Sequence, residues 1–183
     1  MRQRGWPPSG TPRVEWRRRT DAVVAVRHFH LDRIESLEPG VRATGVRAVA
    51  LSDDVFSEHF PGNPVLPGVY LLEGLAQTAG VLLWETTRHA RIAIMVSVDR
   101  ARFNAFARPG DCVHFSVELD TLEADIARVR TIADVNGRQV AAASLTFSMQ
   151  RVERVIPPLY QPHWKQTVDI WLGRFPAEDA GRA

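Results

Sequence analysis

Apolar and polar residues alternate along much of the chain in short runs, which is the pattern of strands that bury one face. Residues 113–119 show it most clearly, because Val113, Phe115 and Val117 alternate with the polar His114 and Ser116. Comparable β-like runs lie at residues 23–37, 41–51, 92–103, 126–135 and 140–149. The pattern therefore predicts a protein that is mainly β-sheet.

Turn signals separate these runs and indicate how the strands connect. Glu38-Pro39-Gly40 lies between the first two runs, and Asn136-Gly137 lies between the last two. Asn-Gly is the strongest short hairpin signal, because both residues tolerate a positive φ. We expect an initial hairpin and then, after a helix, four further antiparallel strands.

A single long helix is predicted over residues 69–88, between the two groups of strands. Its apolar residues occur almost all round the helix: Leu71, Leu72, Leu75, Ala76, Ala79, Leu82 and Leu83. A helix of that kind is buried on most sides, and a sheet that curves around it is the arrangement that buries it. The predicted fold is therefore α+β, with an antiparallel sheet wrapped around one long central helix: the hot-dog fold.

Length and composition favour one globular domain with extensions. The chain has 183 residues, of which 45% are hydrophobic and 24% charged, values typical of globular proteins. We expect a flexible leader rich in Arg and Pro over residues 1–20, the domain over 21–152, and a C-terminal tail over 153–183. Six arginines in the leader make a nucleic-acid arm the alternative. Within the tail, residues 164–175 suggest a short helix on which Trp164 and Trp171 form an apolar stripe that packs on the protein's own domain.

The sequence does not favour a membrane or secreted protein. The longest apolar stretch, residues 65–84, contains Pro67, Gly68, Glu73 and Gln77, which a lipid-spanning helix would not normally carry. The one cysteine, Cys112, cannot form an intrachain disulfide, as is usual in the cytoplasm. We expect a cytoplasmic protein with neither membrane nor nucleic acid as partner.

Candidate chemistry lies in the loop before the helix and in the helix itself. Residues 59–68 contain three prolines and two glycines, and so rigid a loop usually fixes something in place. His59 opens this loop, and Glu73 follows on a predicted buried helix with Gln77 four residues later on the same face. A buried carboxylate is costly unless paired or protonated, so such groups cluster at functional sites. At the start of the helix, Gly68 carries a backbone N–H free to bind an oxyanion.

A base, an acid and an oxyanion donor are the three groups needed to eliminate water from a 3-hydroxyacyl thioester. The base removes the proton next to the carbonyl, the donor stabilises the enolate-like oxygen, and the acid protonates the departing hydroxyl. From these residues alone, a capped core histidine and a structural carboxylate remain the alternative.

The local sequence resembles a known family. Residues 59–69, HFPGNPVLPGV, followed by residues 72–77, LEGLAQ, resemble the 3-hydroxyacyl-ACP dehydratases of bacterial type II fatty-acid synthesis, in the branch with Glu on the helix. Residues 31–34, 37–40, 102–103 and 109–111 are also similar, so the resemblance covers about residues 26–150.

The resemblance implies roles for five residues. His59 would be the general base at C2, and Glu73 would act on the 3-hydroxyl directly or through a held water. The Gly68 N–H would hold the thioester carbonyl, with Val69 beside it in the substrate site. Gln77 would support Glu73.

The resemblance also implies partners. The substrate would be a thioester of acyl carrier protein or coenzyme A, and no metal or organic cofactor is used. A homodimer or a trimer of dimers is expected, in which the histidine and the acid of one site come from opposite subunits. Residues expected at the pocket or carrier entrance are Phe60, Phe103, Phe106, Arg102 and Arg108. A thioesterase of the same fold and a non-catalytic carrier-binding subunit are the alternatives, and a specialised polyketide or lipid pathway is an alternative to fatty-acid synthesis.

Overall fold

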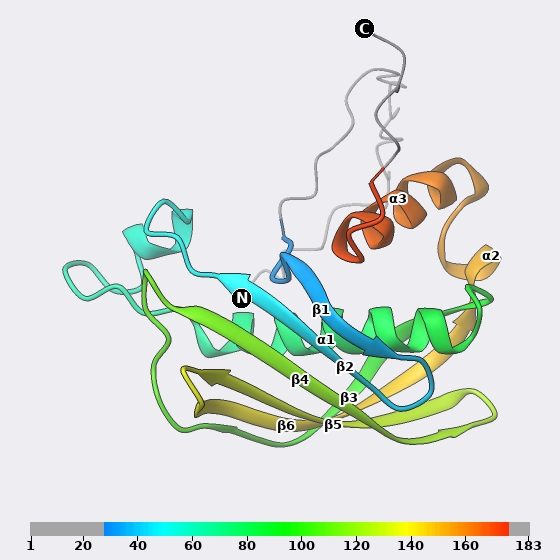
Figure 1. Cartoon of the computed structure of the whole chain (residues 1–183), viewed down its shortest axis with the longest axis horizontal. Coiled ribbons are helices and arrows are strands. Elements are labelled where there is room, and N and C mark those ends of the chain that lie inside the picture. Colours follow the sequence, from blue (N-terminus) through cyan, green and yellow to red (C-terminus); the bar gives the residue numbers. More distant parts are fainter. Residues whose placement is uncertain (1–27, 176–183) are drawn as a thin grey trace, which may run out of the picture.

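An antiparallel sheet curves around the long helix α1 in the computed structural model, which describes residues 28–175 (Figure 1). The strands are β1 (Arg33–Glu38), β2 (Arg42–Ala48), β3 (Arg91–Phe103), β4 (Cys112–Glu123), β5 (Ile126–Val135) and β6 (Arg138–Arg151). The helices are α1 (Gly68–Thr86), α2 (Val152–Val155) and α3 (Gln161–Trp171), with short 3₁₀ helices η1 (Asp54–Ser57) and η2 (Pro158–Tyr160). The strand order is β1-β2-β4-β5-β6-β3, which confirms the predicted sheet and central helix.

Both turn signals act as predicted. Asn136 and Gly137 have φ values of 52° and 76°, the two positive angles that a type I′ hairpin turn requires. The turn sets the β5–β6 register, in which Val135 lies opposite Arg138. Gly40 also has a positive φ, and the N–H of Val41 donates to the Glu38 carbonyl across the β1–β2 turn.

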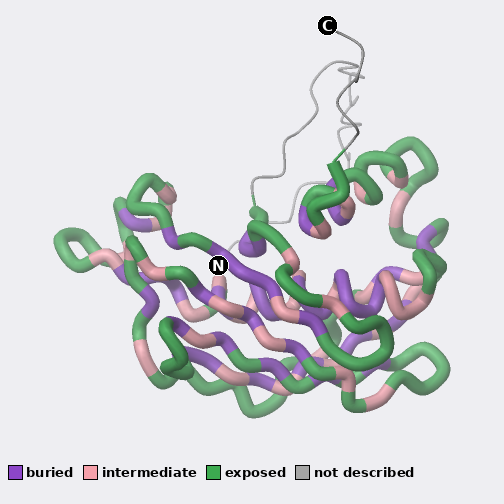
Figure 2. The backbone as a smooth tube through the Cα atoms, viewed as in Figure 1, coloured by how far each residue is buried: buried purple, intermediate pink, exposed green. Residues whose placement is uncertain are grey.

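The core lies between α1 and the concave face of the sheet (Figure 2). Leu75 and Ala79 on the helix and Phe115 on β4 are completely buried. Close approach of helix and sheet depends on Gly74, because a Cβ there would overlap the Phe115 ring and lie 2.8 Å from the His30 carbonyl oxygen. The helix is therefore held by contacts that leave no room for a side chain at this position.

Several predicted boundaries were wrong. The segment 28–32 does not continue β1 towards the N-terminus, because the His30 N–H donates to the side chain of Gln77 instead of to a strand. Helix α1 ends at Thr86, two residues early, where the hydroxyls of Thr86 and Thr87 bond back to carbonyls of the preceding turn. Just before the proline-rich loop lies η1, which the sequence pattern did not predict.

The C-terminal tail packs on the domain, as predicted, although α3 begins and ends earlier than residues 164–175. The rings of Trp171 and Phe29 meet edge to face with centroids 5.1 Å apart. Trp164 meets Trp84 of α1 in the same way at 6.4 Å. In Figure 1, α3 lies across α1 from β5 and β6. The predicted leader falls in residues 1–27, outside the described residues.

A buried polar cluster anchors the segment before β1. Arg47 on β2 contacts Nδ1 of His30, donates to the Phe29 carbonyl at 3.0 Å, and pairs with Asp53 at 2.8 Å. Since arginine can only donate, Nδ1 of His30 must be unprotonated here. Burial, and then the Arg47 charge, lower the pKa of His30 from 6.5 to about 4.

The surroundings of Gly74 and Gly80 predict opposite effects of alanine on the free energy of unfolding. Gly74→Ala should lower the free energy of unfolding by about 1–3 kcal/mol, because the added methyl group overpacks the helix–sheet contact. Gly80→Ala is the matched control on the same helix, since a Cβ there meets nothing within 4 Å, and it should raise stability by about 0.5–1 kcal/mol. Urea unfolding at one protein concentration measures both, and equal effects would contradict the account of Gly74.

The His30 cluster predicts a pH dependence. Below pH 6.5 the unfolded chain binds a proton at His30, whereas the folded chain does so only near pH 4. The free energy of unfolding should therefore fall as the pH is lowered through this window. His30→Gln should flatten that dependence, measured by urea unfolding at pH values between 7 and 5. The same pH slope in both proteins would show that His30 is not the responsible group.

Candidate active site

His59 is held in one orientation by the loop that precedes α1. Its Nδ1 lies 2.8 Å from the Val65 carbonyl oxygen, and the Val65 N–H in turn donates to the His59 carbonyl at 3.0 Å. A carbonyl oxygen only accepts, so Nδ1 carries the proton and the lone pair is left on Nε2. The ring stacks on Phe60 at 4.1 Å between centroids. The half-buried imidazole is thus fixed in the tautomer that can act as a base at Nε2.

The first turn of α1 supplies backbone donors beside this histidine. Helix α1 begins at Gly68, and the N–H groups of a first turn have no partner within the helix. Neither Gly68 N–H nor Val69 N–H bonds to a residue in the described part of the chain. A Cβ on Gly68 would lie 2.8 Å from the Phe103 ring, so glycine allows β3 to approach the helix here.

These groups share a cavity of about 380 Å³. Five of the predicted site residues line it: His59, Gly68, Val69, Phe103 and Phe106. Phe60, which was also predicted at the pocket, does not line it; its ring stacks on His59 and is half exposed. The cavity therefore combines an oriented base with two free N–H donors.

Glu73 lies in a second cavity, of about 400 Å³, together with Gln77. Nε2 of Gln77 donates to Oε1 of Glu73 and to the His28 carbonyl, each at 2.9 Å. Oε1 of Gln77 accepts from the His30 N–H at 2.9 Å. Because that N–H can only donate, the amide cannot be reversed, and its NH₂ group must face Glu73. The predicted support of Glu73 by Gln77 thus has a defined geometry.

The two cavities have no lining residue in common. The geometry of α1 explains the separation: Glu73 follows Gly68 by five residues, or about 140° around the helix axis. One chain therefore presents His59 with the Gly68 N–H to one cavity and Glu73 to the other. The sequence placed all three in one loop–helix unit, but the structure does not bring them together within a single chain.

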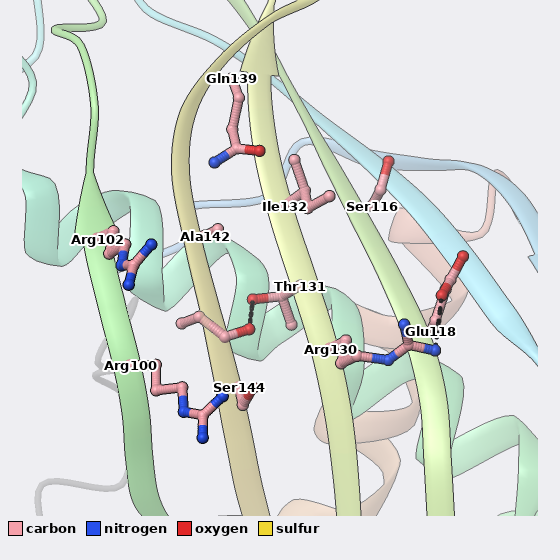
Figure 3. A pocket seen from close by; sticks show the side chains of 11 residues that line it. Arg100, Arg102, Ser116, Glu118, Arg130, Thr131, Ile132, Gln139, Ala142 and Ser144 are labelled. Carbon is pink, nitrogen blue, oxygen red and sulfur yellow. Dashed lines mark hydrogen bonds and ion pairs between the residues drawn. The ribbon is translucent and has the colours of Figure 1, made fainter.

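The predicted entrance arginines also separate. Arg108 donates to Asn63 Oδ1 at 2.8 Å and to the Pro64 carbonyl at 3.1 Å, and its guanidinium lies 5.8 Å from the Phe106 ring centroid. Arg102 instead lines a depression of about 400 Å³ on the outer face of the sheet, beside Arg100 (Figure 3). Of these two arginines, only Arg108 thus lies beside an aromatic residue of the His59 cavity.

Apart from Glu73 and Gln77, the residues that line the Glu73 cavity were not predicted as site residues. Phe29, Trp164 and Trp171 all line it. The spacing of the two tryptophans indicated an apolar stripe, but nothing in the sequence indicated which part of the domain the stripe would cover. Among residues 28–175, no group of three or more His, Cys, Asp or Glu residues is placed to hold a metal ion, and no helix in this range is long and apolar enough to cross a membrane.

The FabA-like domain model matches residues 25–144. A 3-hydroxyacyl-[acyl-carrier-protein] dehydratase FabZ from Chloroflexus aggregans is 39% identical over 120 residues, covering 65% of this chain and 83% of that protein. Another, from Latilactobacillus sakei, is 40% identical over 121 residues, covering 66% and 86%.

Solved structures show the same fold. A hot-dog-like protein from Thermanaerovibrio acidaminovorans has a TM-score of 0.55 at 21% identity, over 71% of this chain and 93% of that one. The dehydratase heterocomplex ApeI:P from Xenorhabdus doucetiae gives 0.58 at 13% identity, over 78% and 90%. With most of the domain matched, the family predicted from the sequence is confirmed, and the chain belongs to the family of FabA-like domains.

Proposed function

We propose that the chain is a hydro-lyase that removes water from a (3R)-3-hydroxyacyl thioester and forms the trans-2-enoyl thioester. The observation that carries this proposal is His59, whose free Nε2 shares a cavity with the unpaired Gly68 N–H. A base next to an oxyanion donor is what removal of a proton α to a thioester carbonyl requires. The similar FabZ proteins, at 35–40% identity, are 3-hydroxyacyl-[acyl-carrier-protein] dehydratases, and we assign the chain to the same kind of reaction, in fatty-acid synthesis.

Elimination follows from these roles. Nε2 of His59 takes the C2 proton while the Gly68 N–H stabilises the negative charge that develops on the thioester oxygen. The C2 electron pair forms the new double bond, and the C3–O bond breaks. Protonated Glu73 donates its proton to the departing hydroxyl, which leaves as water. Proton exchange with solvent then restores neutral His59 and protonated Glu73.

The separate cavities support a site shared by two subunits. Within one chain, His59 and Glu73 face different cavities, so a second copy is needed to bring a carboxylic acid to the His59 cavity. Strand β3 offers a surface on which a second copy could bind, because it is an edge strand of 13 residues. Four of its apolar side chains are at least 39% exposed: Ile94, Met95, Val96 and Val98. A long apolar edge favours pairing with another strand. We infer a homodimer, alone or within a trimer of dimers, with β3 at its interface.

We infer that the thioester is carried by acyl carrier protein in the cytoplasm. Arg108 and Phe106 lie at the His59 cavity and offer positive charge beside an apolar surface for an acidic carrier. Arg100 and Arg102 add positive charge on the outer face of the sheet. The single Cys112 is an exposed free thiol, which suits a reducing compartment.

Substitution of the two proposed catalytic groups tests the reaction. His59→Ala and Glu73→Gln should each lower kcat by about 10²–10⁴-fold, because each removes one positioned proton-transfer group. His114→Ala is the matched control, since His114 pairs with Glu35 at the surface, away from both cavities. Hydration of a crotonyl thioester, measured by loss of enoyl absorbance on carrier protein and on coenzyme A, gives the rates. Release of free thiol in place of hydration would indicate a thioesterase and contradict the proposal.

Mixed dimers test whether the site is shared. His59→Ala and Glu73→Ala chains, each inactive alone, should recover about a quarter of wild-type activity when co-expressed equally, because half the dimers are mixed and one of their two sites has both groups. If each site lay within one chain, no mixed dimer would contain an intact site. Activity that stays at the level of the single variants, in dimers shown to contain both chains, would contradict a shared site.

A further inference from the structure

The cavity that contains Glu73 extends along α1 towards the C-terminal helix α3. Its α1 residues fall on one face of the helix: Glu73, Ala76, Gln77, Gly80, Val81 and Trp84. Glu73 and Trp84 are eleven residues apart, which is about 16 Å along the helix axis. Strand β3 forms another wall with Ile92, Ile94 and Met95. Glu73 and Trp84 therefore mark opposite ends of this face, about 16 Å apart along the helix axis.

Two tryptophans of helix α3 line this cavity. Trp164 lines it and packs edge to face on Trp84, so Trp164 lies at the end farthest from Glu73. Trp171 lines it nearer to Gln77, where it packs on Phe29. The helix is also fastened to α1 by Arg174, which donates to both carboxylate oxygens of Glu85 at 3.0 and 3.2 Å. Two aromatic contacts and a bidentate ion pair thus hold α3 over the cavity.

This wall is not part of the segment that matches the family. The FabA-like match ends at residue 144, whereas Trp164 and Trp171 lie 20 and 27 residues further along the chain. The residues lining the far end of the cavity therefore include two that the family model does not cover.

We propose that α3 is the end wall of the acyl-chain subsite and that Trp164, assisted by Trp171, sets the longest acyl chain the enzyme accepts. The inference rests on the proposed dehydratase function: with C3 of the substrate held at Glu73, the rest of the acyl chain must leave in some direction. The cavity at Glu73 has a mainly apolar lining along one helix face, which suits an alkyl chain. The Trp164 indole at the far end of the cavity limits how far that alkyl chain can extend.

Gly80 offers a second, independent way to change the same cavity. It lies midway along the lining face of α1, and a Cβ there meets nothing within 4 Å. A Cβ at residue 80 therefore points into open space, and a larger side chain built on it would fill part of the cavity. Enlarging the cavity at Trp164 and filling it at Gly80 should move the chain-length preference in opposite directions.

The experiment measures kcat/KM for enoyl thioesters of increasing acyl length on the full-length protein. Trp164→Ala should raise the ratio of long-chain to short-chain kcat/KM, by about fourfold for each additional methylene group buried. Trp171→Ala should raise it less. Gly80→Leu should lower the ratio. Ile170→Ala, an exposed position on α3 outside the cavity lining, is the matched control and should leave the profile unchanged.

The possible outcomes distinguish failure of this inference from failure of the proposed dehydratase function. If the wild type hydrates no enoyl thioester of any length, the proposed function fails. If the wild type is active but Trp164→Ala and Gly80→Leu both keep its length profile, α3 is not the end wall and the inference is overturned. Trp164→Leu, which keeps an apolar contact with Trp84, replaces the alanine variant if circular dichroism shows that the latter does not fold, and it should raise the ratio in the same direction.

Discussion

Burial of α1 inside the curved sheet is the constraint on which the site depends. Gly74 lets the helix pack so closely on Phe115 and the His30 carbonyl that even a Cβ at this position would clash with both. That close packing sets where every functional group on the helix points. The free N–H of Gly68 is directed to one cavity, and Glu73, about 140° around the axis, to another. One chain thus presents these groups to separate cavities, which is why we propose that a second subunit completes the site.

A single amide links this buried helix to the segment before β1. Gln77 holds Glu73 with its NH₂ group and is itself held by the backbone of His28 and His30. The same segment carries Phe29, on which Trp171 of α3 packs. The orientation of Glu73 and the position of α3 thus both depend on residues 28–30. This segment is anchored by the contact between the neutral His30 ring and Arg47.

The sequence was informative wherever local chemistry decides the outcome. The Asn136-Gly137 turn, the alternation around Phe115 and the apolar run of α1 each specify their own structure, and the long motif from His59 to Gln77 identified the family. What could not be predicted depends on contacts between distant segments. Nothing local shows that the His30 backbone turns to Gln77 and leaves the strand, that Arg102 and Arg108 end on different surfaces, or that α3 lies over the Glu73 cavity. The five-residue spacing of Gly68 and Glu73 does predict that they diverge around one helix, but it could not show that they line separate cavities.

The most direct test of the central claim is the structure of the assembled protein bound to a non-hydrolysable 3-hydroxyacyl thioester analogue. We predict His59 Nε2 within hydrogen-bond reach of C2, the Gly68 N–H on the carbonyl oxygen, and Glu73 of the partner subunit at the 3-hydroxyl, with the alkyl chain directed towards α3. A ligand that contacts His59 and Glu73 of the same chain, or that lies away from both, would contradict it.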